Sequence, residues 1–232
     1  MATLTTLRAD LRLDLNDPTG AQERFADADL DRAIARALIE LSRALPCVQE
    51  ATLRTTAGSR RVDLSGLAGL WDVEAVEWPT GAYPRRWRRF ELAPDKQSVT
   101  LLVTAPPAAA EDVLVQWTKG HTLDGLDGAT STTMPEECDE LLLLGAYGFA
   151  AWAYSTPAAD NFRYQDGAQF AQVDDSMIAP EWRARGEHAL TNFRARLADL
   201  QRSRVVQAAS TVVWSEPRPA PRWPRTAAGR EP

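Results

Sequence analysis

Cysteine, histidine and lysine are scarce in this sequence. Its 232 residues include 2 cysteines and 2 histidines, and lysine supplies only Lys96 and Lys119 of the 26 basic residues. Two isolated cysteines make neither a disulfide framework nor a zinc site, so we expect Cys47 and Cys138 to be buried or idle thiols. The scarcity of histidine and cysteine also counts against a hydrolase with an unrecognised site.

Long apolar runs are absent as well. No stretch approaches the roughly 20 apolar residues of a membrane span. The opening, MATLTTLRADLRLDL, mixes charged residues with leucine from the start and lacks the apolar core of a signal peptide. We therefore expect a soluble product that is made in the cytoplasm and has no membrane partner.

The charge is acidic and uneven. The net charge of −6 disfavours a general nucleic-acid-binding protein. Residues 48–203 contain 15 basic and 22 acidic residues, whereas residues 204–232 contain 5 basic and 2 acidic residues. A basic tail therefore follows an acidic body.

The first 47 residues predict a hairpin of two helices. Leucine recurs at positions 4, 7, 11 and 15, which places one apolar stripe along a helix, and the segment 16–20 ends it. The second helix is expected at 27–45, after the poor N-cap Ala26 and before Pro46. Its apolar stripe comprises Leu30, Ile34, Leu38, Leu41 and Leu45.

After residue 48 the pattern changes to short runs rich in β-branched and aromatic residues. These runs are ATLRTT, RRVDL, DVEAVEW, RRFEL, SVTLLV and DVLVQWT, and turn-forming segments separate them. Their spacing predicts a small antiparallel sheet or barrel within about 50–118. WDVEAVEW alternates fairly well, which places Trp71, Val73, Ala75 and Glu77 on one face.

Helices are expected again at 135–155 and 179–202. The first begins with Pro135 and is apolar nearly all round, which is typical of a central, buried helix. The segment between them, 156–178, is a long polar connection of the kind that is usually functional or disordered. The buried stripe of the last helix comprises Trp182, Ala189, Phe193, Leu197 and Leu200.

The last 29 residues hold five prolines and predict an extended arm that is either disordered or ordered by a partner. The fold class is therefore α+β, a bundle of about four helices with an inserted small antiparallel β module and an extended C-terminal arm. The domains are the helical hairpin 1–47, the β insertion 48–120, the C-terminal helices 121–203 of the same bundle, and the arm 204–232.

Two clusters of arginine and tryptophan are candidate protein interfaces. The first is Arg85, Arg86, Trp87, Arg88 and Arg89. It is either a contact patch for an acidic protein or a nucleic acid, or a strand edge with solvated charges. The second lies in the arm and comprises Trp214, Arg218, Arg222, Trp223 and Arg225. Arginine and tryptophan are enriched at interface hot spots, but a disordered terminus also explains the second cluster.

No residue pattern predicts catalysis, a metal or a cofactor. An acidic cluster, Glu136, Glu137, Asp139 and Glu140, is explained by the positive end of a helix dipole and includes no histidine. His121 and His188 lack a nucleophile motif, so we expect surface or structural roles. GLDGAT at 125–130 lacks the Gly-Lys-Ser/Thr ending of a phosphate loop and predicts a turn. We expect a protein that is not an enzyme.

Three segments in order carry a family resemblance over about 1–200. They are LRADLRLDLNDPTGAQERFADADLDRAIARALIELSRALP, then VEAVEWPTGAYPRRWRRFEL with VTLLVTAPPA and VLVQWTKGHTLD, then TMPEECDELLLLGAYGFAAWAYS. These resemble, respectively, the first two helices, the β insertion of the longer actinobacteriophage-type members, and the central helix of head-to-tail adaptor (connector) proteins of tailed phages. Two features depart from that family. Ala26 stands where members often have Ser or Thr, and the Pro-rich tail is longer than expected.

The resemblance implies a structural ring subunit of the virion neck, assembled in the host cytoplasm. The family's ring is usually twelve-fold, docks beneath the portal protein and receives the tail or stopper protein. Genomic DNA would pass through its lumen without specific binding. The family has no catalytic residues to carry over. The alternatives are another neck or tail-completion/stopper protein of the virion and, less favoured, an enzyme or binding module with an unrecognised site.

Overall fold

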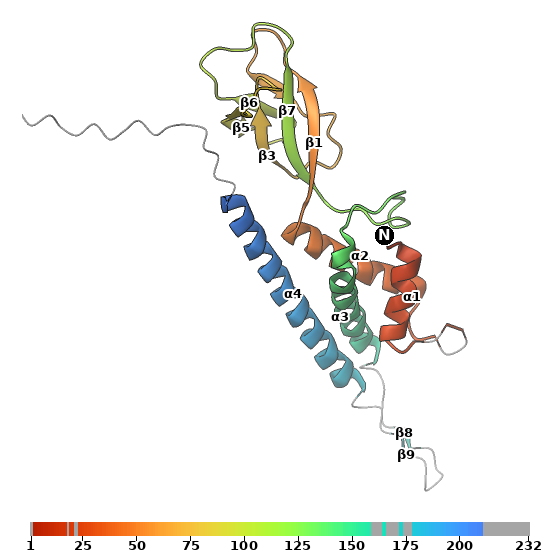
Figure 1. The fold of residues 1–232 in the computed structure, drawn as a ribbon. Helices are drawn as coiled ribbons and strands as arrows, with labels where there is room; N and C mark the ends of the chain where they lie inside the picture. The colour runs from red at the N-terminus through yellow and green to blue at the C-terminus, as the bar shows by residue number, and fades with distance from the viewer. Residues whose placement is uncertain are drawn as a thin grey trace, which may run out of the picture.

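The computed structural model describes residues 2–17, 19–20, 23–158, 164–165, 172–173 and 178–210, and these form an α+β fold (Figure 1). The helices are α1 (Leu4–Asp14), α2 (Asp27–Ala44), the 3-10 helix η1 (Glu136–Cys138), α3 (Asp139–Ala158) and α4 (Ile178–Ser210). The strands are β1 (Cys47–Arg54), β2 (Arg61–Asp63), β3 (Asp72–Glu77), β4 (Trp87–Arg88), β5 (Phe90–Leu92), β6 (Ser98–Leu101), β7 (Asp112–Lys119), β8 (Tyr164–Gln165) and β9 (Gln172–Val173). The predicted helices with an inserted β module are therefore confirmed.

The predicted hairpin of α1 and α2 is confirmed. Thr3 caps α1, because its hydroxyl accepts a hydrogen bond from the Thr6 amide and the Thr6 hydroxyl accepts one from the Thr3 amide. All four leucines of the predicted stripe are buried against the other helices. At α2 the N-cap Ala26 makes no side-chain hydrogen bond, and the helix ends shortly before Pro46.

The third helix, α3, is the centre of the helical body, as its apolar composition predicted. It contacts α1, α2 and α4, and Figure 1 shows it between α4 and α1. Glycines at positions 145, 148 and 186 bring α3 and α4 close together. A β-carbon at Gly148 would lie 2.8 Å from Leu190, and one at Gly186 would lie 2.8 Å from the Trp152 amide nitrogen.

The last helix is longer than predicted. It continues to Ser210, so the predicted arm boundary at residue 204 falls inside α4. The sequence SRVVQAAS at 203–210 contains neither proline nor glycine, and nothing in it ends a helix. Most of the predicted connection 156–178 and all of 211–232 lie outside the described residues, apart from the end of α3 and the pair β8–β9.

Two small antiparallel sheets build the β module around their own apolar core. Their strand orders are β1–β7–β3–β4 and β2–β6–β5. The predicted placement of alternate residues of β3 on one face is wrong, because a bulge at Glu74 breaks the alternation. Val73 pairs with Trp117 and Ala75 pairs with the next residue, Gln116. The extra residue turns Val76, which was predicted to face the other way, into the core with no exposed surface.

Two neighbouring connections join the β module to the helical body. The first is Pro46, which leads from α2 into β1, and the second is the segment after β7. β1 pairs with β7 along its whole length, beginning with Cys47 opposite Lys119. The predicted turn at 125–130 is confirmed, with Gly125 and Gly128 at positive φ. This turn reaches α1, where the Leu4 amide donates to the Asp124 carbonyl over 2.9 Å.

Candidate interaction surfaces

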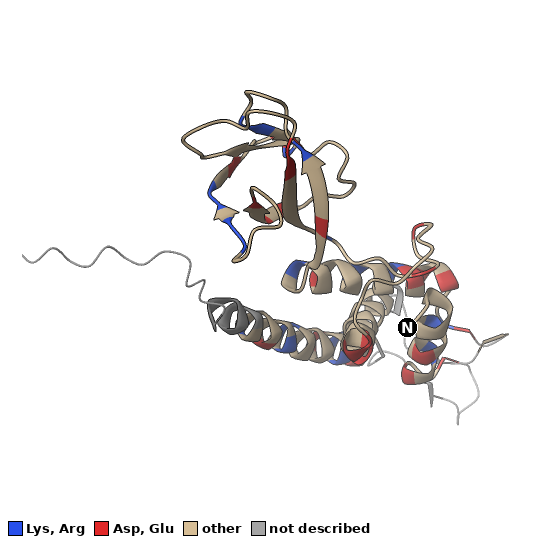
Figure 2. Cartoon of the chain, turned by 45° about the horizontal axis from the view of Figure 1, so that its top comes forward, with Lys and Arg blue, Asp and Glu red and all other residues tan. Residues whose placement is uncertain are grey.

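The arginine-rich segment 85–89 lies along strand β4 and its flanks, and Figure 2 shows it as a blue stretch on the β module. Arg85 is not merely solvated. Its guanidinium lies 3.6 Å from a carboxylate oxygen of Glu50 and 3.8 Å from one of Glu77, and it stacks over the Trp87 ring at 5.8 Å. Glu77 is 2% exposed, and among the described residues its Oε1 has no hydrogen-bond partner. Arg85 therefore supplies positive charge beside a buried carboxylate.

Arg88 also has a structural role. Its Nε donates to the Trp78 carbonyl over 2.6 Å, and its guanidinium lies 5.6 Å from the centre of the Trp78 ring. The indole of Trp78 in turn donates to a carboxylate oxygen of Glu111 over 2.9 Å. These contacts fix β4 against β3. The interpretation that the four arginines carry only solvated charges therefore does not hold for Arg85 and Arg88.

The remaining members of the segment are available to a partner. Arg86 and Arg89 are exposed, and their side chains make no ion pair or hydrogen bond within the described residues. Trp87 is half-buried under Arg85. Tyr83, which the sequence patterns did not single out, is fully exposed in the preceding turn. A contact surface on this edge would therefore consist of Tyr83, Arg86, Trp87 and Arg89.

The second predicted cluster lies outside the described residues. It comprises Trp214, Arg218, Arg222, Trp223 and Arg225. Their role as an interface stays a prediction from the sequence.

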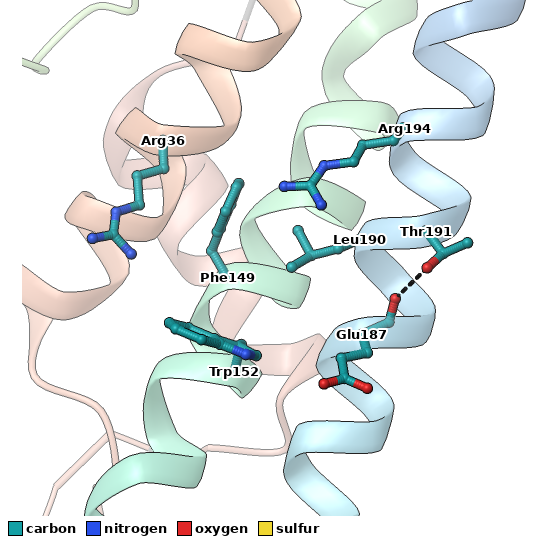
Figure 3. Close-up of a pocket in the computed structure, with 7 residues that line it drawn as sticks. All are labelled: Arg36, Phe149, Trp152, Glu187, Leu190, Thr191 and Arg194. Carbon is teal, nitrogen blue, oxygen red and sulfur yellow. Dashed lines mark hydrogen bonds between the residues drawn. The ribbon is translucent and has the colours of Figure 1, made fainter.

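A groove crosses the helical body, and sequence patterns did not reveal it. It has a volume of about 510 Å³, and Figure 3 shows its side chains converging from α2, α3 and α4. The lining residues are Arg36 from α2, Phe149 and Trp152 from α3, and Glu187, Leu190, Thr191 and Arg194 from α4. Trp152 is 43% exposed although it belongs to the central helix. The groove thus combines an apolar floor with arginines on two sides.

The charged residues of the groove differ in whether they have an ion-pair partner. Arg194 makes a two-pronged contact with Glu40, with N···O distances of 2.9 and 3.1 Å, and this contact raises the pKa of Arg194. Glu187 accepts a hydrogen bond from Arg183 over 3.0 Å. Arg36 is exposed and has no ion-pair partner within the described part of the chain. Of the groove's two arginines, Arg36 is therefore the one free to pair with a partner's carboxylate.

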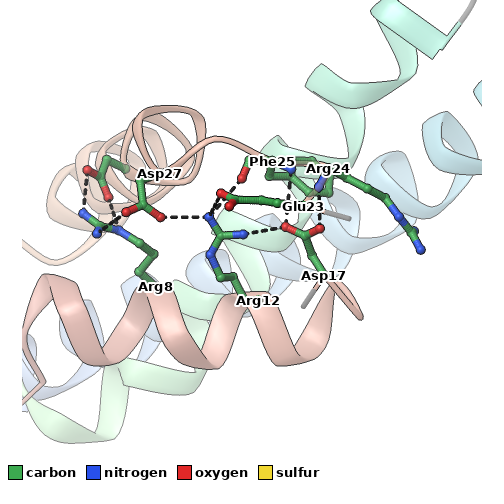
Figure 4. A network of polar contacts seen from close by, with 8 residues as sticks. Arg8, Arg12, Asp17, Glu23, Arg24, Phe25 and Asp27 are labelled. Carbon is green, nitrogen blue, oxygen red and sulfur yellow. Dashed lines mark hydrogen bonds and ion pairs between the residues drawn. The ribbon is translucent and has the colours of Figure 1, made fainter. Parts of the chain in front are cut away.

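A network of charges around the buried pair Arg12 and Asp17 fixes α1 to the loop before α2 (Figure 4). Arg12 is only 6% exposed, donates to Asp17 over 2.6 Å and to Asp27 over 2.8 Å, and pairs with Glu23. It also donates to the Phe25 carbonyl over 2.9 Å. Burial alone would lower the pKa of Arg12, but its carboxylate partners outweigh burial and raise it. This network is fully satisfied within the chain, so it holds the fold rather than offering a site.

The histidines occupy structural positions. The His121 amide donates to the Ser42 hydroxyl over 3.0 Å, and its ring nitrogen Nδ1 lies 3.1 Å from the Thr133 carbonyl. Burial lowers the pKa of His121. His188 is exposed on α4, where its ring lies 3.1 Å from the Asn192 amide nitrogen. His121 thus links the end of α2 to the segment that leads into α3.

The other candidate chemical groups lie near the beginning of α3. The four acids of the predicted cluster occupy η1 and the first turn of α3, at the positive end of the helix dipole. Both cysteines are free and buried, as expected, and burial raises the pKa of the Cys138 thiol. Within the described residues, no group of three or more His, Cys, Asp or Glu side chains could hold a metal ion, and no helix is long and apolar enough to cross a membrane.

No family model matches this chain, and no curated protein matches it. Inferences about function therefore rest on the sequence and the structure alone. Its two exposed surfaces, the edge at 83–89 and the helical groove, have residue types that are typical of protein contacts.

Proposed function

We propose that this chain is a structural head-to-tail adaptor subunit of a tailed phage, which forms a ring beneath the portal and joins the DNA-filled head to the tail. The observation that carries the proposal is the order of the elements. Two helices are followed by a β module and then by two more helices that complete the same body. This is the order that the resemblance predicts.

The surfaces support a role in assembly rather than in catalysis. Both open surfaces combine aromatic side chains with arginine, which is the composition of protein-interface hot spots. The proposed partners are other copies of this chain, in a ring of twelve, together with the portal protein and a tail or stopper protein. Genomic DNA would pass through the lumen without specific binding, and the chain would act in the neck of the virion without a cofactor.

Electron microscopy of the virion neck tests this proposal directly. We expect twelve copies of the chain in one ring between the portal and the next neck protein. A six-fold arrangement further along the tail would favour the alternative of a tail-completion or stopper protein. A reconstruction in which the neck contains no density for this chain would refute both.

A further inference from the structure

The outer face of α1 carries an apolar residue between two acids. Leu13 is 79% exposed, and Asp10 and Asp14 are exposed beside it. Positions three and four apart lie next to one another on a helix, so Asp10 borders both Leu13 and Asp14. We call Asp10, Leu13 and Asp14 the α1 face.

Within the part of the chain that the structure describes, the acids of the α1 face form no ion pair with a basic residue. Arg8 and Arg12, the basic residues of α1, are occupied by Asp27, Asp31 and the buried network. Asp10 and Asp14 form no ion pair or hydrogen bond within the described residues. Partial desolvation by the surrounding protein and the neighbouring charge of Asp10 raise the pKa of Asp14, although its side chain reaches solvent. A cation supplied by another molecule would relieve this repulsion.

The groove of the helical body has the complementary chemistry. Its floor of Phe149, Trp152 and Leu190 suits an inserted leucine, and Arg36 at its edge is an arginine without a partner. The leucine of the α1 face would therefore cover the apolar floor while its acids pair with Arg36. Because every copy of the chain has both surfaces, the α1 face of one copy can bind the groove of another.

The two surfaces lie on different sides of the molecule. Figure 1 shows α1 and α4 on opposite sides of α3. The groove is lined by α2, α3 and α4, whereas α1 contributes no residue to it. If the α1 face of one copy binds the groove of the next, the first copy in the row keeps a free groove and the last keeps a free α1 face. Such a contact is head-to-tail, and it gives a ring if the rotation between copies closes and an open filament if it does not.

We propose that the α1 face binds in the groove of a second copy of this chain, with Leu13 against Trp152 and the acids facing Arg36. This inference rests on the homo-oligomeric part of the proposed function and assigns it a specific contact. It requires no other protein and can be tested with the purified full-length chain.

Disulfide trapping tests the contact between two copies. One copy carries Asp14→Cys and the other carries Arg36→Cys, the position in the groove lining that the proposal places opposite the acids. The natural cysteines are buried and remain in place. We expect this pair to form a mixed disulfide at least about tenfold faster than a control pair in which Leu102→Cys, exposed on the β module, replaces Arg36→Cys. Equal rates for the two pairs would overturn the proposal.

Charge reversal tests the same contact without cross-linking. In sedimentation of the full chain, Arg36→Glu should weaken self-association by at least about tenfold, because it places like charges together. Combining Arg36→Glu with Asp14→Arg in one chain should recover most of that loss. The matched control is Arg196→Glu, an exposed α4 position outside the groove lining, which should leave association unchanged. Loss in the control equal to that of Arg36→Glu, or no recovery in the double variant, would contradict the pairing.

The two proposals fail in different ways. If the chain occupies a ring in the neck but the trapping and reversal experiments are negative, copies meet through other surfaces and only this contact is wrong. If the contact forms in solution and the chain is absent from the neck, the contact stands and the adaptor function is wrong.

Discussion

Gly186 lies where α4 crosses α3 at close range. A β-carbon built at this position would lie 2.8 Å from the Trp152 amide nitrogen, 3.0 Å from the Gly148 carbonyl oxygen and 3.2 Å from the Trp152 Cα. All three are backbone atoms of the central helix. Unlike the end of a flexible side chain, they cannot rotate away.

The substitution Gly186→Ala therefore has two opposed effects on the free energy of unfolding. Alanine is a better helix former than glycine by about 1 kcal/mol. The new methyl group, however, forces α3 and α4 apart by roughly 0.5 Å, and a gap of that size loses about a quarter of the dispersion attraction across the interface. Overpacking of this kind costs about 1–3 kcal/mol in well-packed cores, before any gain in helix propensity is counted. Taking the two effects together, we expect Gly186→Ala to lower the free energy of unfolding by about 1 kcal/mol.

Urea denaturation followed by helical circular dichroism measures this change. The midpoint should fall while the slope of free energy against urea stays constant, because the surface exposed on unfolding is similar. The control is Ala184→Gly, an exposed position in the same turn of α4, which should lose about 1 kcal/mol through helix propensity alone. If Gly186→Ala stabilises the protein by the amount that Ala184→Gly destabilises it, the close approach of the two helices is wrong.

Three further predictions concern buried polar groups. Asp17→Ala removes a fully buried carboxylate partner of Arg12 and should lower the free energy of unfolding by about 3 kcal/mol in urea denaturation, whereas no effect would mean that the network is not formed. His121 has a lowered pKa, so below about pH 6.5 the unfolded chain takes up its proton first and the protein loses stability as the pH falls. His121→Asn should lose less stability between neutral pH and pH 5 than the natural chain, as measured by thermal unfolding, and identical profiles would exclude this residue. Trp78→Phe removes the indole donor to Glu111 and should cost about 1–3 kcal/mol in urea denaturation, unless that hydrogen bond is absent.

Local periodicity predicted most of the elements. The leucine stripe of α1 and the apolar stripe of α2 depend only on residues a few positions apart, and both helices lie where the sequence places them. Two predictions, the buried face of β3 and the end of α4, were wrong for local reasons. One extra residue at Glu74 changed the buried face of β3, and α4 ran on to Ser210 because no residue there ends a helix.

The surfaces were harder to predict than the elements. The exposure of Trp152 could not be predicted from the sequence, because α3 is apolar nearly all round. The groove as a whole could not be predicted either, because Arg36 and Arg194 come from other helices. The roles of Arg85 and Arg88 depend on partners from distant strands and turns. One available signal was overlooked, the glycines at positions 145 and 148 of α3, because small residues within a helix often mark a close helix neighbour.

The pairing of β1 with β7 has a consequence for how the chain is built. The β module is entered at Cys47 and left at Lys119, and these two residues lie directly opposite each other in the sheet. Paired residues of antiparallel strands are about 5 Å apart, so a short linker could bridge the same gap between α2 and the segment that leads to α3. The module can therefore be shortened, enlarged or exchanged without moving the helices. The exposed edge at 83–89, proposed as a contact surface, can change independently of the body that carries it.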